Sequence, residues 1–242
     1  MATVVLLDIG NTKTKLAISD GRNILQTKEF FSHEPDFSEL PEQFDHWVLS
    51  SVVPELGSDW IAKLSKVAKG IQLKKAEKFD FIFDVSKKAE VGDDRLADIE
   101  GAYFLGFNAP FITIDFGTAS VINLVTPKNE FVGGAIGPGV MSSFDCLISK
   151  AALLKSVELE IPTEVIGHDT KTNLDAGFIF GFSFWAEGFY HEIKKFYPEL
   201  KALMTGGAAS LISKVATFPC RYVPNLSLLG LLRILELNQH LL

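Results

Sequence analysis

Two short turns in this chain combine a carboxylate with small residues directly after an apolar segment. The first is Asp8-Ile9-Gly10-Asn11-Thr12 and the second is Asp115-Phe116-Gly117-Thr118-Ala119. Such a turn places backbone N–H groups and hydroxyls around a phosphate, while the carboxylate faces a cation. One copy is weak evidence, because strand ends carry Asp-x-Gly simply to reverse direction. Two copies in matching contexts favour an ATP site with its metal.

A third group of polar residues, Gly92-Asp93-Asp94-Arg95, stands at the expected start of a helix. In phosphoryl transfer to an alcohol, a carboxylate accepts the hydroxyl proton and orients the nucleophile. Asp94 is therefore a candidate base. Capping of the helix by Asp93 or Asp94 explains the same spacing equally well, so both interpretations stay open.

Two glycine-rich segments complete the set of candidate turns. Gly206-Gly207 follows an expected strand at 202–204, so its bare backbone either approaches a flat ligand such as adenine or simply turns the chain. Gly133 to Gly139 contains four glycines and one proline in seven residues. That composition predicts a tight, backbone-exposed loop, which lines a pocket or only reverses the chain.

The elements that must position these turns repeat along the chain. Each half shows a strand that ends in the Asp turn and then two further strands, at 3–7, 15–18 and 23–30 and again at 111–114, 121–125 and 131–134. Asp8 and Asp115 are 107 residues apart, close to half the chain, which indicates an internal duplication. A strand at 47–53 and helices at 58–68, 96–105, 139–154, 173–196 and 228–241 are also expected. This alternation predicts an α/β protein with two similar lobes, 1–108 and 109–242, that meet along a cleft.

The composition excludes several other classes of protein. A net charge of −7 and a pI of about 5.3 argue against a nucleic-acid surface, which needs clustered cations. No apolar stretch is long enough to span a membrane, and no basic segment precedes the first apolar run, so we expect a cytoplasmic protein without a membrane partner. Cys146 and Cys220 lack metal-ligand spacing and are expected to be reduced core residues.

Together, these motifs resemble those of type III pantothenate kinases, members of the acetate kinase, sugar kinase, Hsp70 and actin superfamily. The resemblance covers nearly the whole chain, with five motifs in the family's order: Asp8 to Thr12, Ser50 to Pro54, Gly92 to Arg95, Asp115 to Ala119 and Gly133 to Gly139. It implies two actin-like (ribonuclease H-like) lobes with an ATP cleft between them, and a homodimer. The implied activity is ATP-dependent phosphorylation of pantothenate to 4'-phosphopantothenate, the first step of coenzyme A biosynthesis.

The resemblance also assigns roles to residues by their position in the motifs. It makes Asp94 the base that accepts the pantothenate hydroxyl proton, and Asp115 the ligand of a monovalent cation, K⁺ or NH₄⁺. Pantothenate would contact Val85, Gly92, Asp93, Arg95 and, across a dimer interface, Thr170, for which Thr172 is a near competitor. ATP with its Mg²⁺ would be held by Asp8, Ile9, Gly10, Asn11, Thr12, Lys13, Thr14, Lys15, Gly117 and Thr118.

One part of the substrate motif departs from the family. Members often carry a Tyr seven residues before the Gly of Gly-x-Asp-Arg, with a Pro between them, whereas Val85 and Lys88 occupy these positions here. Val85 cannot donate the phenolic hydrogen bond, and Phe81 or Phe83 would restore part of the pocket wall. The departure concerns pantothenate affinity and not the class of reaction.

Three alternative functions are compatible with some of these features. A non-catalytic nucleotide-binding regulator would keep the fold, but the joint presence of Asp94, Arg95 and Asp115 argues against it. A kinase for a sugar or an acetyl-type acid is disfavoured by the Gly-x-Asp-Arg motif and the short chain. A purely structural assembly protein leaves the paired phosphate turns unexplained.

Overall fold

The chain forms two compact units in the computed structural model, which describes residues 2–150 and 158–242. Unit 1 contains residues 1–108 and 225–242, and unit 2 contains residues 109–224. The sequence predicts a second lobe that continues to residue 242. In the structure the last helix instead packs with unit 1, because its apolar residues are buried against the first sheet and against helix α2.

The sheet of unit 1 places Asp8 at the end of its central strand. Its strands are β1 (Val4–Ile9), β2 (Lys13–Ser19), β3 (Ile24–Phe31), β4 (His46–Ser51) and β5 (Lys69–Gln72), in the order β3-β2-β1-β4-β5. β1 is antiparallel to β2 and parallel to β4. The apolar side chains of β1 are buried on both faces of the sheet, which explains its nearly continuous apolar sequence.

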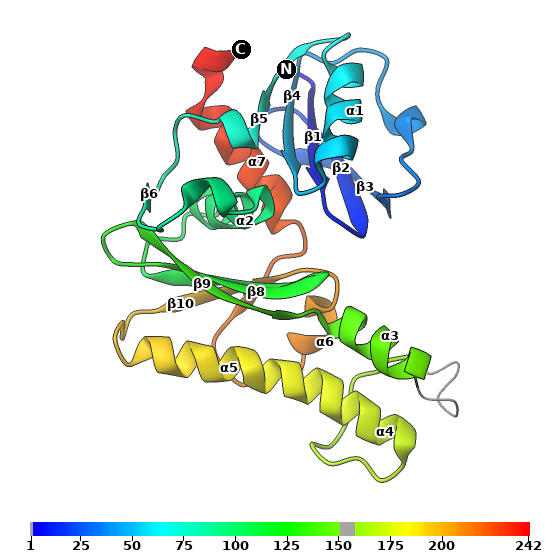
Figure 1. The fold of residues 1–242 in the computed structure, drawn as a ribbon. Coiled ribbons are helices and arrows are strands. Elements are labelled where there is room, and N and C mark those ends of the chain that lie inside the picture. The colour runs from blue at the N-terminus through cyan, green and yellow to red at the C-terminus, as the bar shows by residue number, and fades with distance from the viewer. Residues whose placement is uncertain (1, 151–157) are drawn as a thin grey trace. The chain divides into compact units, whose positions relative to one another are not determined.

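Helices cover both faces of this sheet (Figure 1). Helix α1 (Pro54–Leu64) lies on one face, where Trp60 packs with Val5, Leu7 and other members of an apolar cluster. Helices α2 (Asp93–Phe104) and α7 (Leu226–Leu237) lie on the other face. The other elements of residues 1–108 and 225–242 are short. They are the two-residue strand β6 (Ile82–Phe83) and 3₁₀ turns at 37–39, 73–75, 88–90 and 239–241.

Helices α2 and α7 cross at two glycines. A Cβ at Gly230 would overlap the carbonyl of Ala97 and lie 2.9 Å from the Gly101 nitrogen, and a Cβ at Gly101 would overlap the Leu226 carbonyl. Only glycine permits backbones to approach this closely. The crossing fixes where α7 begins relative to the first sheet.

Unit 2 repeats the same strand order. Its strands are β7 (Phe111–Phe116), β8 (Ala119–Val125), β9 (Glu130–Pro138), β10 (Lys201–Thr205) and β11 (Arg221–Tyr222), in the order β9-β8-β7-β10-β11. Each strand corresponds to one of unit 1, so Asp115 occupies on β7 the position that Asp8 has on β1. The internal duplication expected from the sequence is therefore present in the topology.

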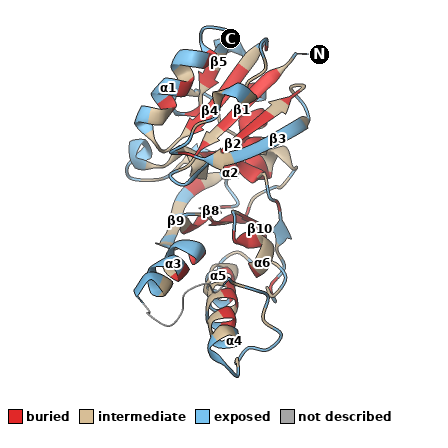
Figure 2. Ribbon diagram, turned by 90° about the vertical axis from the view of Figure 1, so that its right-hand side faces the viewer, coloured by how far each residue is buried: buried red, intermediate tan, exposed pale blue. Residues whose placement is uncertain are grey.

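The helices of unit 2 pack on its sheet around an apolar core (Figures 1 and 2). They are α3 (Val140–Lys150), α4 (Thr170–Asp175), a π-helical segment (Ala176–Phe180), α5 (Gly181–Lys194) and α6 (Ala209–Ile212). Ile114 and Phe116 of β7 meet Ala186 and Tyr190 of α5 in this core. In the part of the chain that the structure describes, no helix has the length and apolar character needed to cross a membrane.

Three sequence-based expectations about local structure need correction. Gly133 to Gly139 is largely strand β9 and not a loop, and its Gly134 allows close approach of the Ile122 carbonyl on β8. The helix expected at 58–68 spans Pro54–Leu64, since proline starts it at its first position. Cys146 is exposed on α3 and not in the core. The end of the helix expected at 139–154 lies outside the described residues.

Glu100 of α2 is a buried carboxyl group that is only half satisfied. It is 0% exposed, its Oε1 accepts the Asp80 N–H at 2.9 Å, and its Oε2 has no hydrogen-bond partner. Burial, with the nearby charge of Asp80 in the same direction, raises the pKa of Glu100 to about 8. Arg233 of α7 pairs with Asp80, with 2.9 Å between Nη2 and Oδ1.

We predict that Glu100 makes stability fall as the pH rises. Its folded-state pKa of about 8 lies above its ordinary value of 4.5, so its stabilising contribution is complete below about pH 4.5 and is lost towards pH 8. Glu100→Gln keeps the acceptor for Asp80 and should gain a few kcal/mol at pH 8.5, since one pKa unit is worth about 1.4 kcal/mol. Urea unfolding at pH 5 and pH 8.5 measures this, with Glu42→Gln at an exposed position as the control. Equal pH dependence in wild type and Glu100→Gln would contradict the prediction.

Candidate functional site

Asp8 is held by two serine hydroxyls from distant parts of unit 1. Its Oδ1 accepts the hydroxyl of Ser50 at 2.9 Å, and its Oδ2 accepts the hydroxyl of Ser227 at 2.6 Å. Ser50 is paired with Asp8 in the parallel register of β1 and β4, whereas Ser227 is the second residue of α7. Sequence reasoning missed Ser227, because a lone serine near the end of the chain carries no motif.

The predicted helix start at Gly92 is present, and the glycine has a steric reason. Gly92 is the N-cap of α2, and a Cβ there would lie 2.5 Å from Oδ1 of Asp94. The Asp94 side chain folds back so that this oxygen accepts the Arg95 N–H at 2.8 Å. Asp94 is thus the second residue of α2 and not its N-cap, and α2 has no side-chain capping bond. The Asp94 bond to a backbone amide uses Oδ1 and does not exclude a chemical role.

The carboxyl groups of this region influence each other. Burial raises the pKa of Asp93 to about 6, although a hydrogen bond from the Ser51 N–H and the charge of Lys74 act in the opposite direction. Burial also raises the pKa of Asp94, and the negative charge of Asp8 adds to the effect. Burial lowers the pKa of the Arg95 guanidinium. A carboxyl group with a raised pKa is suited to accept a proton near neutral pH.

The turn after β1 exposes some of the predicted phosphate-binding residues and buries others. Asn11, Thr12 and Lys13 are exposed, and Lys13 forms an ion pair with Glu29. Gly10 closes the turn by donating its N–H to the Lys13 carbonyl at 3.0 Å. Two other predicted residues, Ile9 and Thr14, are 0% exposed, and the Thr14 hydroxyl lies 3.0 Å from that of Ser32, so both contribute to the core of unit 1.

Lys15 lies beside Asp8 across the strand pair. The two residues are directly opposite each other in the antiparallel register of β1 and β2. Opposite residues point to the same face of a sheet, so the ammonium group of Lys15 extends from the same side as the Asp8 carboxylate.

In unit 2, glycine backbones support the corresponding carboxylate. A Cβ at Gly206 would overlap Oδ1 of Asp115, and a Cβ at Gly117 would lie 3.2 Å from Oδ2. Gly206 has a φ of +96°, which glycine adopts without strain. The exposed Thr118 follows, and its carbonyl accepts the Ser142 hydroxyl at 3.0 Å.

These surroundings fit cations that are bound through few protein ligands. No group of three or more His, Cys, Asp or Glu side chains suited to a metal occurs within residues 2–150 and 158–242. Mg²⁺ bound with a nucleotide needs only one or two carboxylates, because waters and phosphates fill its other positions. Asp8 fits this role, and the cradle that Gly117 and Gly206 leave around Asp115 fits a single cation.

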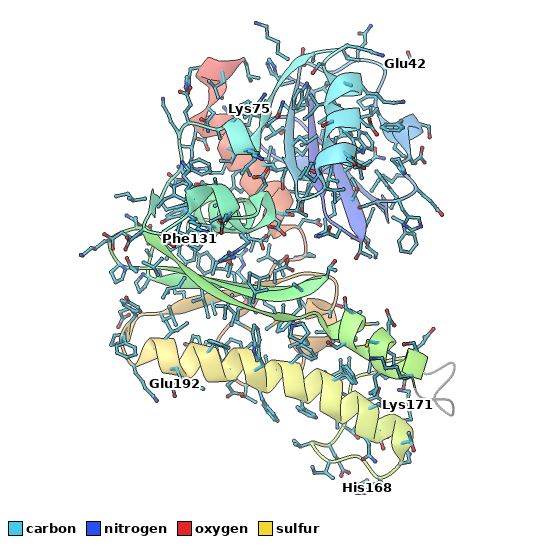
Figure 3. The ribbon with its side chains drawn as sticks, in the orientation of Figure 1. Glu42, Lys75, Phe131, His168, Lys171 and Glu192 are labelled. Atoms are coloured by element: carbon cyan, nitrogen blue, oxygen red, sulfur yellow. The ribbon has the colours of Figure 1, made fainter. Side chains whose placement is uncertain are left out.

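The residues predicted to contact the substrate lie in different elements. Val85 is half-buried before α2, while Thr170 is exposed at the first turn of α4. Thr172, the near competitor, has its hydroxyl in a capping box with Asp169. Figure 3 labels His168 and Lys171, which are close to Thr170 in the sequence.

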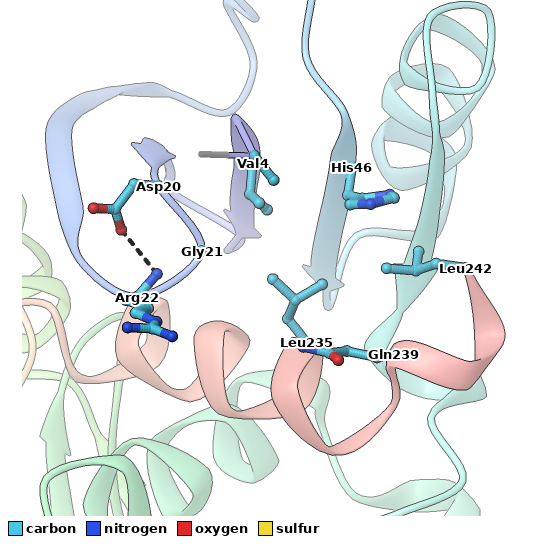
Figure 4. Close-up of a pocket in the computed structure, with 9 residues that line it drawn as sticks. Val4, Asp20, Gly21, Arg22, His46, Leu235, Gln239 and Leu242 are labelled. Carbon is cyan, nitrogen blue, oxygen red and sulfur yellow. Dashed lines mark hydrogen bonds between the residues drawn. The ribbon is translucent and has the colours of Figure 1, made fainter.

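A separate cavity lies at the opposite end of the unit 1 sheet. It has a volume of about 460 Å³, and Val4, Arg22, His46 and Leu235 line it together with residues near both chain ends (Figure 4). Val4 and His46 are the first residues of β1 and β4, whereas Asp8 and Ser50 are near the ends of these strands. The cavity contains none of the residues predicted from the motifs.

Comparison with solved structures defines the class of fold. A Campylobacter jejuni protein assigned to a Baf family of transcriptional activators aligns over 98% of this chain and 99% of its own, with a TM-score of 0.65 and 19% identity. Component A of (R)-2-hydroxyglutaryl-CoA dehydratase from Acidaminococcus fermentans aligns over 100% and 99%, with a TM-score of 0.55 and 12% identity. With two α/β units of equal strand order, the chain has the actin-like fold.

Sequence comparison then identifies the family: the chain belongs to the type III pantothenate kinases, whose family model matches residues 4–192. A type III pantothenate kinase from Exiguobacterium sp. is 30% identical over 98% of this chain and 99% of its own length. The enzyme from Rhodococcus jostii is 36% identical over 64% of this chain. That match spans 59% of the length of the Rhodococcus protein.

We predict that an added methyl group strongly lowers folding stability at Gly206 and changes it little at Gly207. Gly206→Ala forces a side chain onto the Asp115 carboxylate and to 2.5 Å from the Phe116 carbonyl carbon, at a φ of +96°. It should cost at least about 3 kcal/mol of folding free energy. Gly207→Ala meets no atom within 4 Å and should change stability by less than about 1 kcal/mol. Urea unfolding of the two variants checks this, and similar stability losses would show that the glycine cradle is not required.

Proposed function

We propose that this protein transfers the γ-phosphoryl group of ATP to the terminal hydroxyl of pantothenate, giving 4'-phosphopantothenate in the cytoplasm. The observation that carries the proposal is the Gly92–Arg95 helix start in a chain of the type III pantothenate kinase family. There, burial and the charge of Asp8 raise the pKa of Asp94 towards the range of a general base.

In this proposal Asp94 accepts the proton of the substrate hydroxyl. The Arg95 N–H fixes its Oδ1, and Oδ2 would be the proton acceptor. The hydroxyl oxygen forms a bond to the γ-phosphorus as the bond to the ADP oxygen breaks. Arg95 and Asp93, with Gly92, hold the substrate beside Asp94.

The phosphate-binding roles rest on the two Asp turns. The residues proposed to hold ATP are Asp8 with Mg²⁺, the turn from Ile9 to Lys15 in unit 1, and Gly117 with Thr118 in unit 2. Mg²⁺ would supply charge neutralisation of the phosphates. Asp115 would hold K⁺ or NH₄⁺ in its glycine cradle.

In the altered substrate motif, a lysine and phenylalanine rings pack together near the positions where family members often carry a Tyr and a Pro. Lys88 places its Nζ 4.0 Å from the centre of the Phe83 ring, and Phe81 and Phe83 rings are 4.9 Å apart. A cation over an aromatic ring is stabilised electrostatically. We propose that this aromatic group replaces part of the pocket wall near Val85.

The kinase proposal predicts three dependences in one assay of ADP release. Release by the purified protein should require pantothenate, should be much faster in potassium than in sodium buffer, and should fall at least about 100-fold in Asp94→Asn. Glu90→Gln, which removes an exposed carboxylate of the Lys87–Glu90 pair, should leave the rate unchanged.

Several outcomes of this assay would contradict parts of the proposal. Full activity in sodium alone would remove the cation role of Asp115, and unchanged turnover in Asp94→Asn would remove its role as base. ATP binding without any turnover would favour the alternative function, a non-catalytic nucleotide-binding regulator.

We also propose a homodimer formed through one face of α4 and α5 in unit 2. A Cβ at Gly177, Gly181 or Gly188 would have no atom within 4 Å. The rings of Phe180 and Phe184 are stacked, with their centroids 5.8 Å apart. Ile166 is 73% exposed at the edge of an apolar groove of about 300 Å³ that contains Gly177 and Phe184.

The spacing of this face favours a second copy of the chain as its partner. Glycines and phenylalanines both recur four residues apart, at 177 and 181 and at 180 and 184. A helix with alternating small and large residues is self-complementary about a two-fold axis, because the rings of one copy fit above the glycines of the other. In such a dimer, Thr170 would contact the pantothenate of the partner.

The dimer proposal predicts that a charge in the groove separates the protomers. Phe184→Glu, at a position 46% exposed, should weaken the dimer at least about 100-fold, because the symmetric contact is lost twice. Phe196→Glu, at a position 78% exposed beyond the end of α5, should leave it intact. Sedimentation velocity over a concentration series measures both, and a monomeric wild type would contradict the proposal.

A further inference from the structure

The hydroxyl of Ser227 reaches the Asp8 carboxylate from a part of the chain that the family motifs do not include. Ser227 is 5% exposed and 219 residues from Asp8, and its Oγ lies 2.6 Å from Oδ2. The family model matches residues 4–192, so α7 lies beyond it. The contact is therefore a feature of this chain that its family motifs do not predict.

The Asp8 carboxylate acts electrostatically on two other carboxyl groups of unit 1. Its negative charge contributes to the raised pKa of both Asp93 and Asp94, so three carboxyl groups interact in one region of unit 1. Hydrogen bonds from neutral hydroxyls to an ionised oxygen are about twice as strong as those between neutral groups. Ser50 and Ser227 supply one such bond to each oxygen of Asp8.

These two bonds fix orientation and leave acceptor capacity. Each carboxylate oxygen has about two lone-pair directions, and one hydroxyl occupies one of them. The remaining directions are then presented at a defined angle to a cation or to its bound water. Loss of one hydroxyl would let the carboxylate rotate about its terminal torsion, which has a broad energy minimum.

Helix α7 is well anchored, so the position of Ser227 is defined. At its first half Gly230 lies against Ala97 of α2. Just beyond its end, Asn238 accepts the N–H groups of Glu77 and Lys78 at 3.0 and 2.9 Å. A side chain on an element fixed at both ends can hold a partner with little loss of entropy on binding.

We propose that Ser227 is a positioning residue that holds the Asp8 carboxylate in the orientation that receives Mg²⁺ bound to ATP. This inference rests on the proposed function, because it assumes that Asp8 takes part in Mg²⁺·ATP binding. The role belongs to the hydroxyl group and not to the helix packing around it.

The test compares ATP affinity with Mg²⁺ and with EDTA by isothermal titration calorimetry, which needs no turnover. The gain in affinity on adding Mg²⁺ should fall about tenfold in Ser227→Ala, because one charge-assisted hydrogen bond is lost. Ser227→Thr, which keeps the hydroxyl, should retain the gain. Affinity in EDTA should stay within about twofold of wild type in both variants.

A control variant separates positioning from helix stability. Arg233→Gln breaks the ion pair between α7 and Asp80 and the pair with Glu236 within α7, and Arg233 does not contact Asp8. It should lower the melting temperature at least as much as Ser227→Ala and keep the full Mg²⁺ effect. An equal loss of the Mg²⁺ effect in Arg233→Gln would overturn the inference, because helix stability would then explain it.

The failure of this inference is distinguishable from failure of the proposed function. An undiminished Mg²⁺ effect in Ser227→Ala would overturn only the role of Ser227. A wild-type protein that binds ATP with no Mg²⁺ effect, or does not bind it, would overturn the Asp8 site and this inference with it.

Discussion

The close crossing of α2 and α7 determines the geometry of unit 1. Because Gly101 and Gly230 have no room for a Cβ, the two helix axes approach as nearly as backbones allow, and both helices cover the face of the sheet that Asp8 shares. The start of α2 supplies Asp94, and the start of α7 supplies the Ser227 hydroxyl. A larger residue at either glycine would separate the helices and move both groups from Asp8.

The duplicated scaffold supports two carboxylates by different means. Asp8 and Asp115 end equivalent strands, yet Asp8 accepts two hydroxyl groups, whereas Asp115 lies against the bare backbone of Gly206 and Gly117. Hydroxyl donors stabilise a fixed negative charge. A glycine at each position lets the backbone approach the carboxylate closely. The same topology thus gives the two carboxylates chemically different surroundings.

Much of this architecture could be predicted from the sequence, and the failures have physical causes. The Asp turns and the offset between Asp8 and Asp115 predicted the duplication, because strand and turn signals are local. Assignment of the last helix to unit 2 was wrong, since the partner of an apolar helix depends on tertiary packing with no local signal. The segment Gly133–Gly139 was expected to be a loop, because glycine composition alone cannot distinguish a turn from a strand that another backbone approaches closely.

The buried carboxyl groups at the start of α2 lower folding stability but raise the basicity of Asp94. Burial at the start of α2 raises the pKa of Asp93 and Asp94 and opposes their ionisation, and ionised groups there reduce stability above their ordinary pKa. The Ser51 N–H, the Arg95 N–H and Lys74 offset part of this cost. A carboxyl group that was fully solvated would be more stable but a weaker base. The buried start of α2 therefore exchanges folding stability for basicity at Asp94, and the remaining elements of unit 1 must supply the stability that this exchange removes.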